Sequence, residues 1–136
     1  MRSLLAVLIG GFVGTAARLW LDVLIPHKDN QFPLDTLLIN IVGSFVLAIL
    51  ISRVWPVAQQ WVRALLGPGL LGGFTTFSAV MVSMVTLAAN GQILMALVYG
   101  ALTLVLGFGA AALGFRIAGR GGTNAADEVP AMDLDE

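Results

Sequence analysis

The chain has 136 residues, of which 58% are hydrophobic and only 11% are charged, and its mean hydropathy is +0.93. Soluble globular proteins are about 25% charged, so this composition excludes an ordinary soluble domain. The sequence has no cysteine and one histidine, His27, which leaves little material for a disulfide, a thiolate metal site or a histidine-based centre. Because no acid–base pair or phosphate-binding loop stands out either, we expect that the protein is not an enzyme.

The net charge of −1 conceals a strong segregation of charge along the chain. Residues 1–120 contain seven basic residues and three acids, a net charge of +4, whereas residues 121–136 contain five acids and no base, a net charge of −5. The basic residues are Arg2, Arg18, Lys28, Arg53, Arg63, Arg116 and Arg120. They form no basic stripe of the kind that nucleic-acid-binding surfaces need, so we expect no nucleic-acid partner.

Four apolar runs are long enough to cross a bilayer, which takes about 20 residues of helix. They cover residues 3–25, 34–54, 61–89 and 93–118, and polar or turn-forming clusters separate them. We therefore expect an all-α membrane protein in which residues 1–118 form one transmembrane domain. Residues 119–136 are acidic and lack apolar periodicity, which predicts a disordered tail.

The first run also has features of a cleavable signal peptide, since Arg2 precedes an apolar stretch and small residues follow at 14–17. A membrane helix is favoured, because the run continues to Ile25 and three further runs follow. One side of the predicted bundle carries five Lys or Arg residues and the other carries only Lys28. By the positive-inside rule this predicts a multi-pass protein of the cell membrane with both termini in the cytoplasm.

Polar side chains at membrane depth are the candidate functional residues, because each is costly unless it has a partner or lines an aqueous path. Arg18 lies about two thirds along the first run and either snorkels to the interface or lines a vestibule that attracts anions. Asn40 lies early in the second run. Its amide either offers N–H donors to an anion or makes a structural hydrogen bond between helices.

The middle of the third run carries the strongest signal for an interrupted helix. Gly72, Gly73, Thr75 and Thr76 are poor helix formers, and unwound backbone near the bilayer midplane is tolerated only where it is buried in protein or lines a cavity. Freed carbonyls can coordinate a small cation, and the start of the following half-helix favours an anion. The alternative is that the glycines only permit close helix crossing and the hydroxyls bond to their own helix.

A proton-coupled or cation-exporting carrier needs a buried carboxylate. We expect none in this chain, taking Asp22, close to a helix end, as the only acid within a run. This argues against an exporter of the small multidrug-resistance type, the main alternative for a four-helix protein of this size. Small residues at four-residue spacing, such as Gly10 and Gly14, predict closely packed helices.

Three segments together resemble the CrcB (Fluc) family of fluoride channels. They are the glycine-rich first run ending in Arg18, residues 36–45 around Asn40, and the stretch from Gly72 to Ser78. The resemblance covers nearly all of residues 1–118 and leaves out the acidic tail. It implies a passive, fluoride-selective channel in which two subunits form an antiparallel dimer with two pores, through which fluoride leaves the cytoplasm.

The resemblance also implies residue roles. A structural sodium ion that is not transported would be held at the dimer centre by backbone carbonyls of Gly72 and Thr75. Arg18 would lie in a vestibule. The anion path would contain Asn40, Phe77, Ser78, Tyr99 and Thr103.

Two features depart from the family pattern. A phenylalanine is usual where this chain has Val80, and the hydroxyl-bearing track of the fourth helix is reduced to Tyr99 and Thr103. A homodimer would therefore lack one aromatic ring in each pore. Because a homodimer of dual topology needs balanced Lys and Arg, the five-to-one bias predicts a fixed orientation and an oppositely inserted homologous paralogue as partner. A non-conducting or half-conducting structural subunit is the alternative function.

Overall fold

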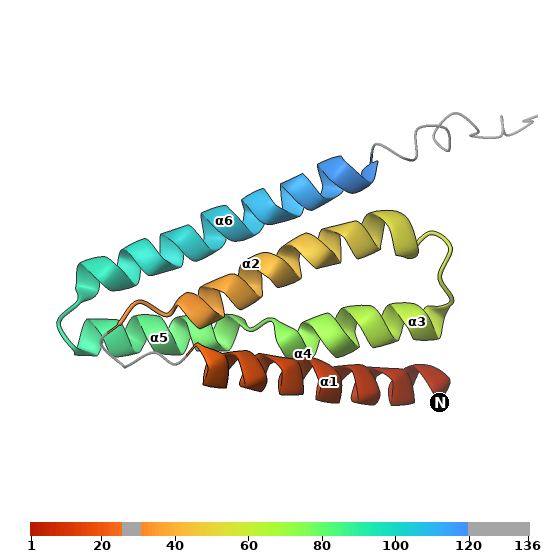
Figure 1. Cartoon of the computed structure of the whole chain (residues 1–136), viewed down its shortest axis with the longest axis horizontal. Coiled ribbons are helices and arrows are strands. Elements are labelled where there is room, and N and C mark those ends of the chain that lie inside the picture. The colour runs from red at the N-terminus through yellow and green to blue at the C-terminus, as the bar shows by residue number, and fades with distance from the viewer. Residues whose placement is uncertain (26–30, 120–136) are drawn as a thin grey trace, which may run out of the picture.

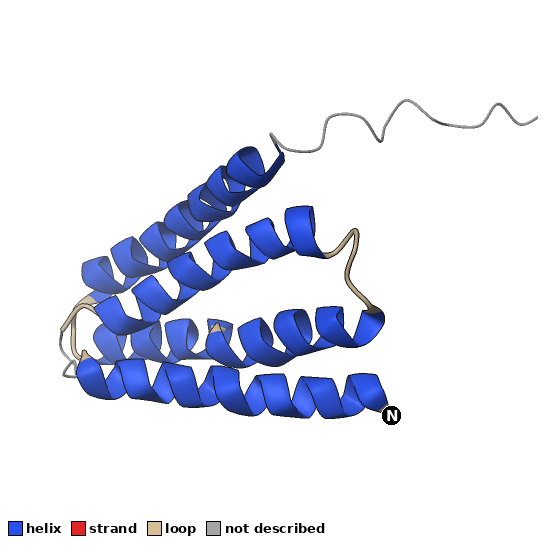
Figure 2. Cartoon of the chain, turned by 45° about the vertical axis from the view of Figure 1, so that its right-hand side comes forward, coloured by secondary structure: helices blue, strands red, loops and turns tan. Residues whose placement is uncertain are grey.

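The computed structural model describes residues 1–25 and 31–119, and all regular elements in these ranges are helices (Figures 1 and 2). Successive long helices run in opposite directions, and the first packs along the third whereas the second packs along the fourth. In chain order the elements are α1 (Arg2–Leu24), α2 (Leu34–Ile49), the π-helical η1 (Leu50–Val54), α3 (Gln60–Ala64), the π-helical η2 (Leu65–Leu71), α4 (Gly72–Phe74), α5 (Phe77–Ala89) and α6 (Ile93–Gly119).

Four helical stretches are long and apolar enough to cross a membrane, which confirms the number expected from the sequence. They are Arg2–Leu24, Leu34–Val54, Gln60–Ala89 and Ile93–Gly119, and their ends lie within one residue of the expected ranges. The agreement arises because the residues that interrupt the hydropathy also end the helices. The predicted disordered tail falls on 120–136, outside the described residues, whereas Gly119, expected in the tail, ends α6.

α1 lies along the third stretch in direct backbone contact. A Cβ atom on Gly14 would collide with the carbonyl oxygen of Leu70, and one on Gly73 would lie 2.7 Å from the carbonyl oxygen of Gly11. Gly10 is also buried against this stretch. The missing side chains allow the close approach that small residues favour in lipid, where dispersion drives the packing of helices.

The packed interior lies between α2, α5 and α6. Its fully buried apolar side chains are Leu37, Val80, Leu87, Ala96 and Tyr99. Most other large apolar side chains point outward, as Phe12 and Phe108 do with about three quarters of their surface exposed. An apolar exterior of this kind suits a lipid environment rather than water.

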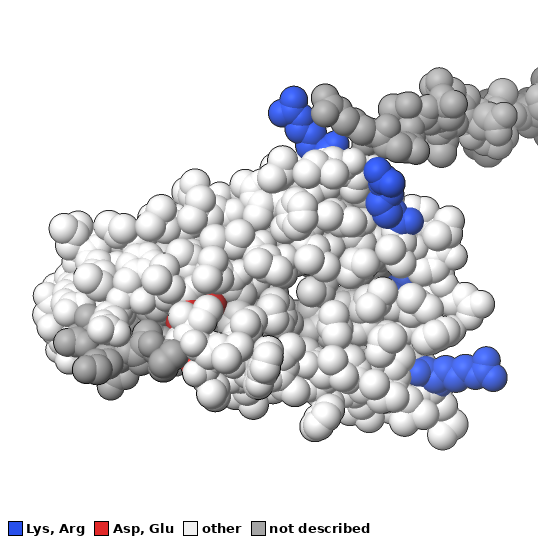
Figure 3. Space-filling view, in the orientation of Figure 1, with Lys and Arg blue, Asp and Glu red and all other residues white. Residues whose placement is uncertain are grey.

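Arginines gather at the end of the bundle where α1 begins and α6 ends (Figures 1 and 3). Arg53 donates hydrogen bonds to the carbonyl oxygens of Ala118 at 2.7 Å and Ile117 at 3.4 Å, and so caps the C-terminus of α6. Cations are favoured there by the helix dipole. Among the described residues, Arg2, Arg53, Arg63 and Arg116 therefore share one end of the bundle.

The expectation that no carboxylate is buried is wrong. Asp35, the second residue of α2, is only 3% exposed. Asp35 also lies within the run 34–54, so Asp22 is not the only acid within a run. A carboxylate is favoured at the start of a helix, where the dipole is positive.

Candidate functional site

The third membrane-crossing stretch changes conformation between α4 and α5. Thr75 and Thr76 have extended backbone, with ψ values of 154° and 122°. Gly72 and Gly73, which we expected to share in the interruption, are helical within α4. The extended backbone is therefore limited to Thr75 and Thr76.

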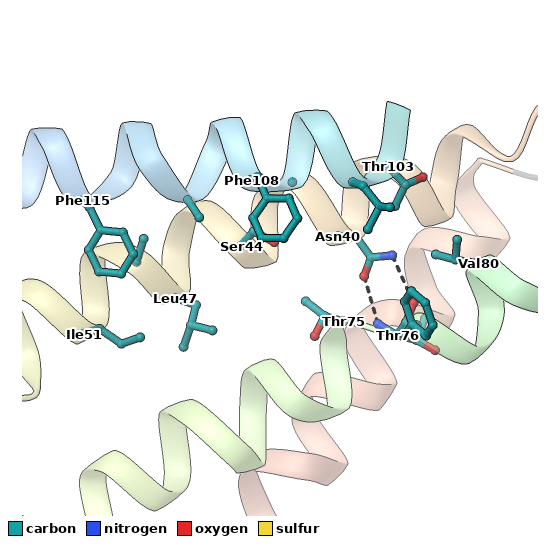
Figure 4. A pocket seen from close by; sticks show the side chains of 15 residues that line it. Asn40, Ser44, Leu47, Ile51, Thr75, Thr76, Val80, Thr103, Phe108 and Phe115 are labelled. Atoms are coloured by element: carbon teal, nitrogen blue, oxygen red, sulfur yellow. Dashed lines mark hydrogen bonds between the residues drawn. The ribbon is translucent and has the colours of Figure 1, made fainter. Parts of the chain in front are cut away.

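Asn40 of α2 holds the extended segment through its side-chain amide (Figure 4). The Nδ2 atom donates to the carbonyl oxygen of Thr76 at 3.1 Å, and the backbone N–H of Thr76 donates to Oδ1 of Asn40 at 3.0 Å. The amide thus replaces both helical partners that Thr76 lacks. The structural hydrogen bond that the sequence left open is therefore present.

The threonine side chains complete the local bonding. Thr76 Oγ1 accepts from the N–H of Ala79 at 3.2 Å and so caps α5, and it lies 3.0 Å from Ser78 Oγ. Thr75 Oγ1 donates to the carbonyl of Leu71 at 2.8 Å, a bond to its own helix. The first N–H groups of α5 have no helical acceptor, as at the start of any helix, and they are suited to an anion.

Two backbone carbonyls beside the interruption lose their usual helical donors. In a continuous helix the N–H of Thr76 would donate to the carbonyl oxygen of Gly72, four residues earlier. Here it donates to Oδ1 of Asn40 instead. The N–H of Ala79, four residues after Thr75, bonds to the side chain of Thr76. Within the described ranges no group of three or more His, Cys, Asp or Glu residues is placed to hold a metal.

A groove of about 360 Å³ lies between α2, α6 and the extended segment (Figure 4). It brings together five of the predicted site residues, which are Asn40, Thr75, Thr76, Phe77 and Thr103. The ring of Phe77 is 65% exposed beside it. None of the lining residues is titratable, and they are polar around Asn40 and apolar elsewhere.

Five predicted residues do not line this groove, and one of them is Gly73, which packs against α1. Ser78 is exposed on the first turn of α5, and Gly72 is exposed one turn before the interruption. Arg18 is half-buried on α1, with a buried Nε that has no hydrogen-bond partner among the described residues. Tyr99 is fully buried in the core, edge-on to the ring of Phe32 at 5.4 Å.

The two hydroxyl-bearing residues of α6, Tyr99 and Thr103, lie one helical turn apart. Thr103 is 8% exposed, and its Oγ1 donates to the carbonyl oxygen of Tyr99 at 2.8 Å. Its proton is therefore committed to its own helix in this conformation. Val80, in the place of the family's second phenylalanine, is 2% exposed and forms part of both the core and the groove floor.

Sequence reasoning missed the apolar part of the groove. Phe108 and Phe115 of α6, Leu47 of α2 and Ile51 of η1 line it (Figure 4). The spacing of Phe108 and Phe115, two turns apart, is the available signal. The spacing alone does not show which face of α6 lines the groove. α6 is apolar on all sides, so its sequence does not distinguish a face toward the groove from a face toward lipid.

Comparison with known proteins gives a consistent result. The family model described as "CrcB-like protein, Camphor Resistance (CrcB)" matches residues 5–115. A protein of Leifsonia xyli named "Fluoride-specific ion channel FluC 1" is 42% identical over 118 residues, which cover 85% of each chain. The "Fluoride-specific ion channel FluC" of Oceanobacillus iheyensis is 36% identical over 87% of this chain and 92% of its own.

A third relative, from Paracoccus denitrificans and with the same name, is 37% identical over 88% of this chain and 96% of its own. These relatives are named as ion channels and not as enzymes, in line with the expectation from the sequence. Together with the four apolar helices, they identify a multi-pass membrane protein. The chain belongs to the CrcB family of fluoride-specific ion channels.

Proposed function

We propose that this chain is a subunit of a passive channel through which fluoride leaves the cytoplasm. The observation that carries the proposal is the groove in which the amide of Asn40, the exposed ring of Phe77 and the interrupted helix meet. An amide N–H and the positive edge of an aromatic ring replace part of the hydration shell of a small anion without adding charge. The N–H groups at the start of α5 add further donors.

The proposed mechanism needs no coupled ion. Because no groove-lining residue is titratable, the described path offers no group that would carry a proton with each fluoride. An inside-negative membrane potential drives the anion outward with about 2.3 kcal/mol per 100 mV. The end of the bundle that is rich in arginine faces the cytoplasm in this proposal, with both termini on that side.

We place the structural sodium ion at the carbonyls of Gly72 and Thr75. Both carbonyls lack their helical donors, and Gly72 is exposed on the single chain. Uncharged oxygen ligands suit a hard monovalent cation and leave the site without a competing carboxylate. When bound, the ion supplies a fixed positive charge beside the interruption, where it steadies the backbone and is not transported.

A second subunit completes the path in this proposal. Ser78, Tyr99 and Arg18 lie outside the groove of the single chain, and Phe77 projects from it. The interruption of the third membrane-crossing stretch lies near the bilayer midplane, and an antiparallel partner covers it. Because Arg2, Arg53, Arg63 and Arg116 share one end, the chain inserts in one orientation, and its partner is an oppositely inserted paralogue rather than itself.

The second candidate function is a half-conducting or purely structural subunit. Two observations favour it, namely the buried Val80 in place of an aromatic ring and the hydroxyl of Thr103 committed to its own helix. An exporter of the multidrug type is not proposed, since the family match covers residues 5–115.

The test is fluoride efflux from liposomes that contain the chain alone or together with a homologous paralogue from the same genome. A potassium ionophore supplies the counter-current, and a fluoride electrode records the release. We expect fluoride release and little chloride release, with the larger rate for the mixed preparation. No fluoride release in either preparation would favour the structural subunit, and a C-terminal tag found equally on both membrane faces would exclude the fixed orientation.

A further inference from the structure

The arginine end of the bundle is a charged surface without an acid of its own among the described residues. Four exposed arginines gather there, namely Arg2, Arg53, Arg63 and Arg116 (Figure 3). The acids of the described ranges are Asp22, near the end of α1, and Asp35, near the start of α2. Both lie at the opposite end of the bundle, since about 30 Å of helix separates Asp22 from Arg2. No acid within residues 1–25 and 31–119 therefore neutralises the arginine end.

The guanidinium groups of this surface keep N–H donors for a further partner. Arg53 donates from Nε and Nη2 to the carbonyl oxygens of Ala118 and Ile117, and Arg63 donates from Nε to the carbonyl oxygen of Ala58 at 3.0 Å. A guanidinium has more donors than these bonds use, and a neutral carbonyl does not balance its charge. A carboxylate matches both the charge and the fork of donors.

The segment that follows α6 in the sequence carries the matching charge. α6 ends at Gly119, at the arginine end, and the segment itself lies outside the described residues (Figure 1). Residues 121–136 contain five acids and no base, a net charge of −5, against four arginines on the surface. The acids are Asp127, Glu128, Asp133, Asp135 and Glu136.

The attachment at Gly119 brings these acids within reach of the whole surface. Asp127 is the first acid after Gly119, and the chain between them can span up to about 28 Å. Packed helices lie about 8–10 Å apart, so the end of a four-helix bundle is roughly 20 Å across. A short tether also gives an effective concentration on the order of millimolar. Anionic lipid headgroups compete for the arginines, but they are not attached to the chain and each carries little charge.

We infer that residues 120–136 dock on the arginine end of their own chain. Carboxylates of this segment pair with Arg2, Arg63 and Arg116, while Arg53 stays bonded to the end of α6. The contact neutralises the surface and keeps its guanidinium groups from lipid headgroups and from other anions on the same side of the membrane. The inference goes beyond the proposed function, since it needs no fluoride and applies equally to a conducting and a structural subunit.

A zero-length cross-link between an amine and a carboxylate tests the contact. Arg63→Lys supplies an amine on α3, far in sequence from the acidic segment, and a water-soluble carbodiimide joins it to a carboxylate in contact with it. In the full chain in neutral lipid vesicles, mass spectrometry of the monomer band is expected to find this amine joined to one of residues 127–136. The rate should fall about fivefold or more between roughly 0.1 and 1 M salt, because the Debye length shrinks from about 10 to about 3 Å.

Two variants separate docking from mere attachment. Asn90→Lys is the matched control, because Asn90 is exposed at the turn that follows α5, at the opposite end of the bundle. Its amine is expected to form no link to residues 127–136 of the same chain. Adding Arg2→Gln and Arg116→Gln to Arg63→Lys removes two of the proposed ion pairs and is expected to slow the link about 2- to 30-fold.

Three results would overturn the inference. The first is no link between the introduced amine and residues 127–136. The second is a rate that neither salt nor the two glutamine substitutions change, because such a link reports only the tether. The third is a link that is lost in vesicles containing phosphatidylglycerol, which offers a phosphate but no carboxylate; this would assign the arginines to lipid headgroups. We expect the link to persist there. Fluoride efflux plays no part in these measurements, so a failure of the proposed function would leave them unchanged.

Discussion

Replacing Asn40 by alanine removes both hydrogen bonds that hold Thr76 in its extended conformation, of 3.1 and 3.0 Å. One such bond contributes about 1 kcal/mol net, and a backbone group left unsatisfied in the interior costs about 1–3 kcal/mol. Because Asn40 and Thr76 are only half-buried, the lower part of this range applies. The ordered interruption is then destabilised by about 2–3 kcal/mol, which favours its opening by roughly 30- to 150-fold.

Hydrogen–deuterium exchange at the backbone amide of Thr76 measures this opening directly. The Asn40→Ala amide is expected to exchange faster by that factor, and fluoride efflux is expected to fall by about tenfold or more while dimerisation is unchanged. Ser44→Ala is the matched control, because Ser44 lies one turn along α2 in the same groove and holds no backbone group of the interruption. Unchanged exchange in Asn40→Ala would refute the assigned role of the amide, and unchanged flux would remove Asn40 from the path.

Three further substitutions test other parts of the structure. Phe77→Ala is expected to lower fluoride efflux about tenfold with a stability change below about 1 kcal/mol, because the ring is 65% exposed; wild-type efflux would exclude Phe77 from the path. Gly14→Val places a side chain against the carbonyl of Leu70 and is expected to lower the free energy of unfolding by about 3 kcal/mol or more, so that little folded protein is recovered. A melting temperature equal to that of the wild type would contradict the backbone contact. Arg53→Gln weakens the cap of α6, and thermal unfolding should show a loss of about 0.5–1 kcal/mol with unchanged efflux; a large loss of efflux would show that Arg53 also serves the anion.

The membrane-crossing helices were predictable because hydropathy is a local property. The stretches 34–54 and 93–118 stand out without any knowledge of their neighbours, since each is bounded by turn residues. The resemblance to the channel family likewise depends on short contiguous motifs. Hydropathy and contiguous motifs can both be recognised in a single sequence.

The details of the site depend on contacts between distant residues. Sequence propensity placed Gly72 and Gly73 in the interruption, but both are helical, and Gly73 packs closely against the backbone of α1. The extended segment is fixed by a side chain 36 residues away, which no local pattern reveals.

The burial of Asp35 was missed for the same reason. The local pattern does not distinguish a buried from an exposed second residue of the run 34–54, yet Asp35 is only 3% exposed. The faces of α6 were indistinguishable as well, because an evenly apolar helix has no polar side to mark the groove. Burial and helix orientation therefore had to come from the structure.

The most direct test of the central claim is the zero-current potential of the channel in a planar bilayer under a fluoride gradient, with equal pH on both sides. The chain is measured alone and with its proposed partner. A passive fluoride channel is expected to reverse at the Nernst potential of fluoride, about 59 mV for each tenfold gradient, whatever chloride gradient is also imposed. A reversal potential near zero, or one that follows an imposed pH gradient instead, would contradict passive, fluoride-selective conduction.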